Sequence, residues 1–146
     1  MCGVGGVLAR RWVEEIMAGR LDVVEDVVAQ DFVEHAVATF GTSAPGRVDG
    51  VAHTKQVVAT LRGQFPDLRM VIETIIEEDD MVAVRVMASG TNSGLGMMPP
   101  TGRGVHAAQG HWFRIHSGRL AEHWAVRDDL STVIQIGLVN PPGRPG

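Results

Sequence analysis

Apolar residues in the first half of the chain recur at the spacing of an α-helix. Leu8, Trp12 and Ile16 lie four residues apart, so their side chains would share one helix face. From this spacing, and from the residues that cap or stop helices, we place helices at residues 7–18, 22–28 and 51–64. Between them the sequence predicts a compact connector over residues 31–35 and a loop over residues 39–50.

In the second half, apolar residues occupy every second position, which is the period of a β-strand. Leu68, Met70 and Ile72 begin this pattern. It predicts a strand from residue 68, a turn at 78–80, a strand over 81–91, a long loop over 92–103 and a short final helix over 130–136. Helices followed by antiparallel strands predict an α+β domain with the helices packed on one face of a curved sheet.

Residues 104–129 are predicted to form a hairpin that carries an unusual number of polar side chains. Gly118 suits the positive φ of its tight turn. Because side chains alternate along a strand, Gln109, His111 and Phe113 would share one face. An amide, an imidazole and an aromatic ring together are typical of a pocket with a few polar groups.

Composition narrows the class of protein. With 146 residues, 45% of them hydrophobic and 21% charged, the chain predicts one globular domain, which we place at residues 7–137 between flexible segments at 1–6 and 138–146. The net charge of −4 and the scattered basic residues argue against a nucleic-acid partner. No long apolar run and no signal-peptide pattern are evident, so we expect a cytoplasmic protein without a membrane partner.

Metal chemistry is not indicated by the sequence. The single cysteine, Cys2, excludes a cysteine cluster and an internal disulfide. The three histidines His106, His111 and His116 follow one another in five-residue steps, which alternate between the faces of a strand and separate the rings too far. The acidic residues 77–80 are predicted to form a solvated turn.

Short motifs in a fixed order resemble a known family. They are DFVEH (31–35), FPDLR (65–69), PPTGR (99–103), FRI (113–115), GRL (118–120), EHW (122–124), DDL (128–130) and QIG (135–137). In this order, over residues 12–137, they resemble the SnoaL-like polyketide cyclases of the NTF2-like superfamily. The resemblance implies a cone-shaped α+β fold that encloses a deep apolar pocket, a homodimer built through the outer face of the sheet, and no metal or cofactor.

The resemblance also implies a reaction, with one departure. The family's founding enzymes close a polyketide ring by an intramolecular aldol step, with a histidine on the first hairpin strand and an aspartate on the second as acid and base. The histidine corresponds to His111, but the position of the aspartate is occupied by Ala125. Asp128 has the wrong strand parity to replace it, and Asp129 is expected to cap the final helix.

Because alanine cannot take a proton from carbon, we favour a ring closure with less proton transfer, such as the intramolecular cycloaddition of a polyene. The pocket would fold the chain into a reactive conformer, and His111 and Gln109 would polarise a conjugated carbonyl. The predicted catalytic residues are His111, Gln109 and His123. The predicted substrate-binding residues are Trp12, His35, Phe65, Met87, Met98, Phe113 and Arg127.

Three alternatives stay open at this stage. The first is an aldol-type polyketide cyclase that uses another base. The second is an epoxide hydrolase or isomerase of the same superfamily, which would need a carboxylate that faces the pocket. The third is a small-molecule binding domain without catalysis.

Overall fold

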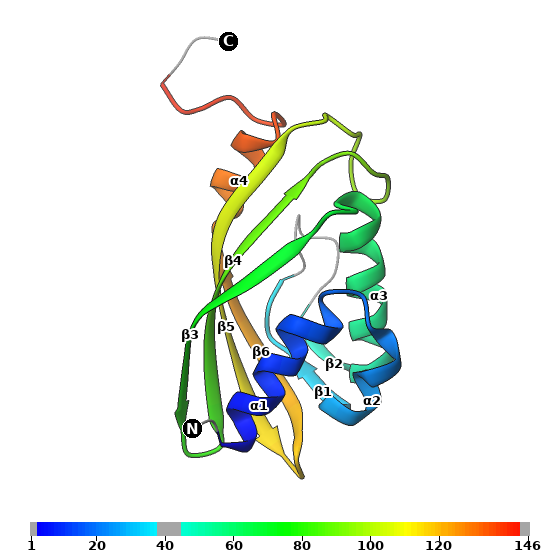
Figure 1. Ribbon diagram of the computed structural model, residues 1–146, viewed down its shortest axis with the longest axis vertical. Helices are drawn as coiled ribbons and strands as arrows, with labels where there is room; N and C mark the ends of the chain where they lie inside the picture. The colour runs from blue at the N-terminus through cyan, green and yellow to red at the C-terminus, as the bar shows by residue number, and fades with distance from the viewer. Residues whose placement is uncertain (1–2, 38–44, 144–146) are drawn as a thin grey trace.

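A curved six-stranded sheet wraps around helices in the computed structural model, which describes residues 3–37 and 45–143. Its strand order is β2-β1-β6-β5-β4-β3 (Figure 1). The strands are β1 (Val28–Glu34), β2 (Gly46–Asp49), β3 (Arg69–Glu78), β4 (Met81–Thr91), β5 (Gly104–His116) and β6 (Arg119–Arg127). The helices are α1 (Val4–Arg11), η1 (Trp12–Ile16), η2 (Leu21–Val23), α2 (Val24–Val27), α3 (Gly50–Gln64) and α4 (Asp129–Gln135).

The predicted α+β architecture is confirmed. α1 contacts β3 and β4, and α3 contacts β1 and β2, so these two helices cover one face of the sheet, while α4 packs against β5 at the far end of the molecule (Figure 1). The core between these layers consists of buried aliphatic and aromatic side chains, among them Ile16, Val24, Val58, Val84 and Leu120. None of the helices among the described residues is long and apolar enough to cross a membrane.

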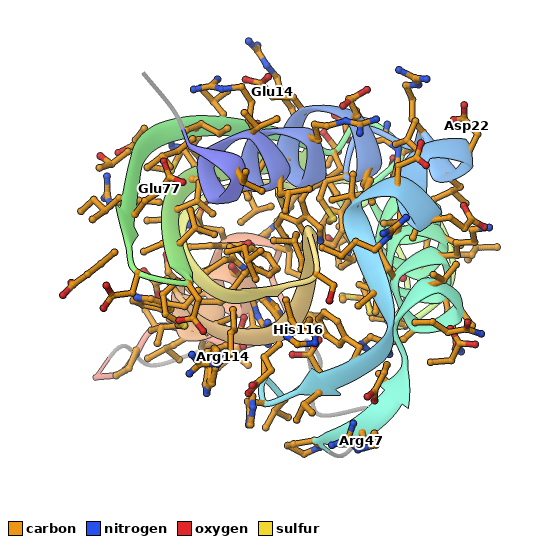
Figure 2. All side chains as sticks on the ribbon, turned by 90° about the horizontal axis from the view of Figure 1, so that it is seen from below. Glu14, Asp22, Arg47, Glu77, Arg114 and His116 are labelled. Carbon is orange, nitrogen blue, oxygen red and sulfur yellow. The ribbon has the colours of Figure 1, made fainter. Side chains whose placement is uncertain are left out.

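The first helix starts earlier than predicted, at Val4 instead of residue 7. The reason is a carboxylate on β3, since Glu77 accepts hydrogen bonds of 2.8 Å from the backbone N–H groups of Gly3 and Gly6 (Figure 2). A negative charge at a helix N-terminus satisfies free N–H groups and complements the helix dipole. The acidic residues 77–80 are therefore not only a solvated turn.

The helix widens at its second half into the π-helical turn η1. The N–H of Met17 donates to the carbonyl of Trp12 over 2.9 Å, a span of five residues in place of four. Such turns change the direction of the side chains that follow and are frequent at functional sites. Here the wide turn begins at Trp12, which is 8% exposed.

Two segments that the sequence predicts as connections contain strands instead. Residues 31–35 were expected to form a connector, but all except His35 belong to β1, which pairs with β2 on one side and with β6 on the other. The predicted loop over 39–50 contains β2 and the start of α3, while residues 38–44 lie outside the described part of the chain. The predicted helix over residues 22–28 is only the short turns η2 and α2.

The sheet is mixed. β1 pairs with β6 in parallel, and every other neighbouring pair is antiparallel. The alternation read from residue 68 onward is confirmed, since Met70 and Ile72 pack against the core. The predicted tight hairpin turn is confirmed as well, with positive φ at Ser117 and Gly118.

The long loop over residues 92–103 is fastened to the end of α3. The buried side chain of Gln64 donates to Asn92 Oδ1 over 2.5 Å and to the carbonyl of Met98 over 3.0 Å. Its Oε1 accepts from the backbone N–H groups of Met97 and Met98. The loop is therefore held against the helix through a completely buried amide, and Met97 on this loop reaches the cavity described below.

Replacing Gly94 by alanine tests this attachment. A Cβ at Gly94 would lie 1.8 Å from the carbonyl oxygen of Gly63, so the loop and the helix end would have to separate. We expect Gly94→Ala to lower the free energy of unfolding by about 1–3 kcal/mol, the usual cost of overpacking. The control is Gly104→Ala, whose Cβ would have no neighbour closer than 3.6 Å. Equal melting temperatures for the two variants would contradict the prediction.

Candidate active site

A cavity of about 490 Å³ lies between α3 and the inner face of the sheet. Much of its wall is apolar, with contributions from Val57, Leu61, Phe65, Leu68 and Met70. A row of polar side chains crosses the wall on the side of β1, β5 and β6. An apolar pocket with a few convergent polar groups is the usual form of a small-molecule site.

The hairpin β5–β6 supplies part of that row, and its register fixes the relative positions. His111 pairs with Ala125, and Phe113 pairs with His123. Gln109, His111 and Phe113 all face inward, as the alternation predicts. Ala125 lies directly opposite His111, so the departure noted in the sequence is beside a residue of the cavity wall.

The polar side chains form one continuous hydrogen-bond network. Gln109 Oε1 lies 2.8 Å from His111 Nε2, and His111 Nδ1 lies 2.8 Å from His123 Nε2. His123 Nδ1 is in turn 2.8 Å from Glu34 Oε1, while Glu34 Oε2 lies 3.2 Å from His53 Nε2. Both ring nitrogens of His111 and of His123 are thus engaged within the network.

Glu34 and His53 belong to this network, and the sequence did not predict either of them. Glu34 lies on β1 in parallel register with His123, and its side chain is 13% exposed. The sequence does not indicate its direction, because it predicts a connector over residues 31–35, in which side chains have no fixed period. The available signal was the strand period, which places Glu34 two residues after the buried Phe32.

The charges in the network shift two pKa values. Burial alone would raise the pKa of Glu34, but hydrogen bonds from His123 and His53 outweigh it and hold that pKa at about 2. The pKa of His111 is lowered well below its ordinary value by burial, and further by the positive charges of His123 and Arg127. Glu34 is therefore an anion and His111 is neutral at physiological pH.

Aromatic rings enclose the two histidines. The ring of Trp12 lies 4.9 Å from His111 and 5.7 Å from His123, measured between centroids. Phe113 stacks on His123 at 4.8 Å. These rings exclude water from the imidazoles, which strengthens the hydrogen bonds between them.

A second charged group lies on the same wall at the end of β6. Arg127 Nε is 3.5 Å from Asp129 Oδ1, and Arg127 Nη2 donates to the carbonyl of Val37. The expectation that Asp129 caps the final helix is wrong, because Asp128 takes that position and accepts from the N–H of Ser131. Asp129 is instead a carboxylate on the cavity wall.

The structure separates the predicted site residues into two groups. The cavity wall includes Gln109, His111, His123, Trp12, Phe65 and Arg127. Outside the wall are His35, Met87, Met98 and Phe113. Phe113 is core beneath the histidines, at 1% exposure.

The other three residues point elsewhere for local reasons. His35 stacks on Trp124 at 4.5 Å and binds Glu122, beyond the end of β1. Met87, on β4, pairs with Ala108 of β5, and its neighbours Val86 and Ala88 are on the buried face. The backbone of Met98 is hydrogen-bonded to the side chain of Gln64, and the adjacent Met97 lies on the cavity wall instead.

No three histidine, cysteine or carboxylate side chains within residues 3–37 and 45–143 converge in a way that could hold a metal ion.

Comparison with known proteins points to one family. A model of the family "SnoaL-like polyketide cyclase" matches residues 7–136. The crystal structure of wild-type IdmH, "a putative polyketide cyclase from Streptomyces antibioticus", is 29% identical, with a TM-score of 0.77, and the match covers 90% of this chain and 96% of that chain. A search of curated proteins finds no significant match.

Two further structures share the fold at lower identity. A "Putative SnoaL-like polyketide cyclase from Jannaschia Sp. CCS1" is 23% identical, with a TM-score of 0.79, over 95% of this chain and 94% of that chain. AclR, "a putative hydroxylase from Streptomyces galilaeus", is 22% identical, with a TM-score of 0.68, over 92% of this chain and 78% of that chain. Proteins described by different activities therefore share this fold, and the reaction has to be argued from the site.

The pKa of Glu34 predicts an acid-labile component of stability. Because this pKa is about 2 in the folded protein and 4.5 is its ordinary value, the stabilisation is complete above pH 4.5 and is lost as the pH falls toward 2. Glu34→Gln removes the titration, so its deficit in unfolding free energy, on the order of 1–3 kcal/mol near neutral pH, should shrink as the pH falls. Denaturant unfolding at a series of pH values measures this. Glu14→Gln, at an exposed pair with Arg10, is the control, and a deficit that does not change with pH would contradict the prediction.

Proposed function

The chain belongs to the SnoaL-like polyketide cyclase family, and from this premise we propose that it closes a carbon ring within a linear polyketide by cycloaddition, without a cofactor. The substrate is a polyene with a conjugated carbonyl. It folds inside the cavity of about 490 Å³, and the wall holds the two reacting ends together. Gln109 donates a hydrogen bond to the carbonyl and makes the conjugated system poorer in electrons.

One observation carries this proposal. Both nitrogens of His111 and both of His123 have partners inside the network, so neither ring presents a free lone pair to the cavity. Gln109 Nε2, by contrast, makes no hydrogen bond to any residue within the described part of the chain, and Gln109 lies on the cavity wall. The network therefore ends in a donor, which suits the activation of a carbonyl better than the removal of a proton.

Glu34 does not supply the base that Ala125 lacks. General-base catalysis is most efficient when the pKa of the base lies near the operating pH. With a pKa of about 2, Glu34 is a weak base, and its two oxygens already accept from His123, His53 and the N–H of Ala36. Its carboxylate can hold a neighbouring charge but is poorly suited to attack a C–H bond.

A second candidate is aldol ring closure, favoured by the position of Asp129. This carboxylate lies on the cavity wall, and its side chain is 46% exposed. Asp129 would take a proton from the carbon next to a carbonyl, and the resulting enolate would attack a second carbonyl of the same chain. The product would then be a hydroxy ketone, or an enone after loss of water.

Substitution of Gln109 tests the first proposal. Gln109→Leu keeps the apolar volume and removes the donor, so the rate of cyclisation of a synthetic linear polyenone should fall by about 10²-fold. His111→Ala, which leaves the Gln109 amide without its partner, should lower the rate in the same direction. The control is Gln30→Leu at an exposed site on β1, away from the cavity. Unchanged rates in the two cavity variants would refute the role of the amide.

A substrate that carries deuterium on the carbon next to the carbonyl separates the two ring closures. A cycloaddition forms its bonds without breaking C–H bonds, so the product should keep all of this deuterium. An aldol closure must remove one deuteron from that carbon before the new C–C bond forms, so the product should lack it, and ring closure should stop in Asp129→Asn. Mass spectrometry of the product, compared with substrate incubated without the protein, measures both, and loss of deuterium during turnover would decide for the aldol reaction.

A further inference from the structure

The hydrogen-bond network fixes where its protons lie. Gln109 presents Oε1 to His111, and an amide oxygen only accepts, so His111 Nε2 carries a hydrogen. His111 is neutral because burial and the nearby charges lower its pKa, so its Nδ1 is an acceptor. The hydrogen in the 2.8 Å contact between the two rings therefore belongs to His123 Nε2.

The same reasoning at the other end assigns a charge to His123. Glu34 is a carboxylate, which only accepts, so the hydrogen in its 2.8 Å contact belongs to His123 Nδ1. His123 then carries hydrogens on both nitrogens and is an imidazolium ion. It forms a buried pair with Glu34, and the 7% exposure of His123 leaves little water to replace that partner.

The surroundings of His123 are consistent with a cation. Its ring faces Phe113 on β5 at 4.8 Å and Trp12 on η1 at 5.7 Å, both of which favour a positive charge through their π-electrons. From β1 it faces Glu34, whose other oxygen binds His53 of α3. Farther along the chain, Arg127 at the end of β6 lies with its Nε 3.5 Å from Asp129 Oδ1 at the start of α4.

Loss of one proton from His123 would reverse the two hydrogen bonds between His123 and Gln109, namely the one between the imidazole rings and the one from His111 to the amide. A neutral His123 that still donates to Glu34 has a lone pair on Nε2, so His111 would have to donate from Nδ1. His111 Nε2 would then be an acceptor, and only the NH₂ group of Gln109 could satisfy it. The amide would have to turn over, which exchanges a donor for an acceptor at the cavity.

We propose that Glu34 is a positioning residue that keeps a proton on His123 and thereby sets which end of the Gln109 amide faces the substrate. This rests on the proposed function, in which the NH₂ end donates to a carbonyl. With His123 charged, the amide is a donor and the site is active. With His123 neutral, an oxygen faces the carbonyl and repels it.

Histidine NMR on the full-length ¹⁵N-labelled protein tests the proton positions without any substrate. In the wild type near neutral pH, both nitrogens of His123 should be protonated, and no coupling through a hydrogen bond should join Gln109 Nε2 to His111 Nε2. In Glu34→Gln, His123 should lose one proton and that coupling should appear. The matched control is Glu122→Gln, which removes a carboxylate paired with His35 at the neighbouring position of β6 and should leave the wild-type pattern unchanged.

Three results would overturn the proposal. They are a neutral His123 in the wild type, an unchanged imidazolium in Glu34→Gln, and a neutral His123 whose loss of charge does not turn the amide. If Glu34→Gln fails to fold, the wild-type spectrum still tests the proposal, because hydrogens on both nitrogens of His123 must occur together with the absence of the Gln109–His111 coupling.

Turnover separates this proposal from the proposed function. Glu34→Gln should slow cyclisation about as much as Gln109→Leu, and the double variant should be little slower than either, because both changes remove the same donor. If the NMR pattern is found but none of these variants affects turnover, the proposed function fails while the proton positions stand. If Gln109→Leu slows turnover and the NMR pattern is absent, the function stands and the role of Glu34 fails.

Discussion

The contact between Glu34 and His123 is the interaction on which the site depends, and the parallel pairing of β1 with β6 makes it possible. This pairing joins the first part of the chain to the hairpin, and its register places Glu34 beside His123. An isolated carboxylate in this wall would be costly, because burial disfavours the charged form. Hydrogen bonds from two histidines and a backbone N–H offset that cost, so carboxylate and imidazoles are stable there only together.

The apolar surroundings give these polar groups their strength. Trp12 and Phe113 cover the two imidazoles, and the remaining wall is largely aliphatic. In such an environment a hydrogen bond is electrostatically stronger than in water, and each bond in a chain polarises the next. A charge held by Glu34 at one end can therefore influence the amide of Gln109 at the other, although the two side chains do not touch.

The sequence predicted the features that depend on a short repeat of apolar and polar residues. The alternation on β5 placed Gln109 and His111 on one face, and the turn glycine fixed the hairpin. It did not predict β1, because a short mixed segment is equally consistent with a connector, and a parallel partner 89 or more residues away leaves no local signal. The role of His53 was not predicted for the same reason, since it depends on the packing of α3 against β1.

The same limit explains why some predicted substrate-binding residues lie outside the cavity wall. Met87 was expected in the cavity for its flexible side chain, but a strand position is decided by parity, and Met87 has the wrong one. Met98 is adjacent to Met97, the methionine on the cavity wall. The hydrogen bonds between Gln64 and the loop, and not composition, decide which of the two side chains turns inward. Such choices depend on tertiary contacts that no local pattern contains.

Ala125 and His123 together determine how far the negative charge lies from His111. Residues opposite one another in an antiparallel pair bring their side chains within about 4.5–5.5 Å at Cβ, so a carboxylate at position 125 would reach His111 directly. Alanine leaves His111 Nδ1 to His123, and the negative charge lies one strand farther away, on β1. The Glu34 carboxylate can fix protons and polarise the network, but its oxygens already accept from His123, His53 and the N–H of Ala36, and its low pKa makes it a weak base. The arrangement keeps a charge that polarises His111 but places no base directly beside it, and this is the combination on which the proposed ring closure without proton abstraction rests.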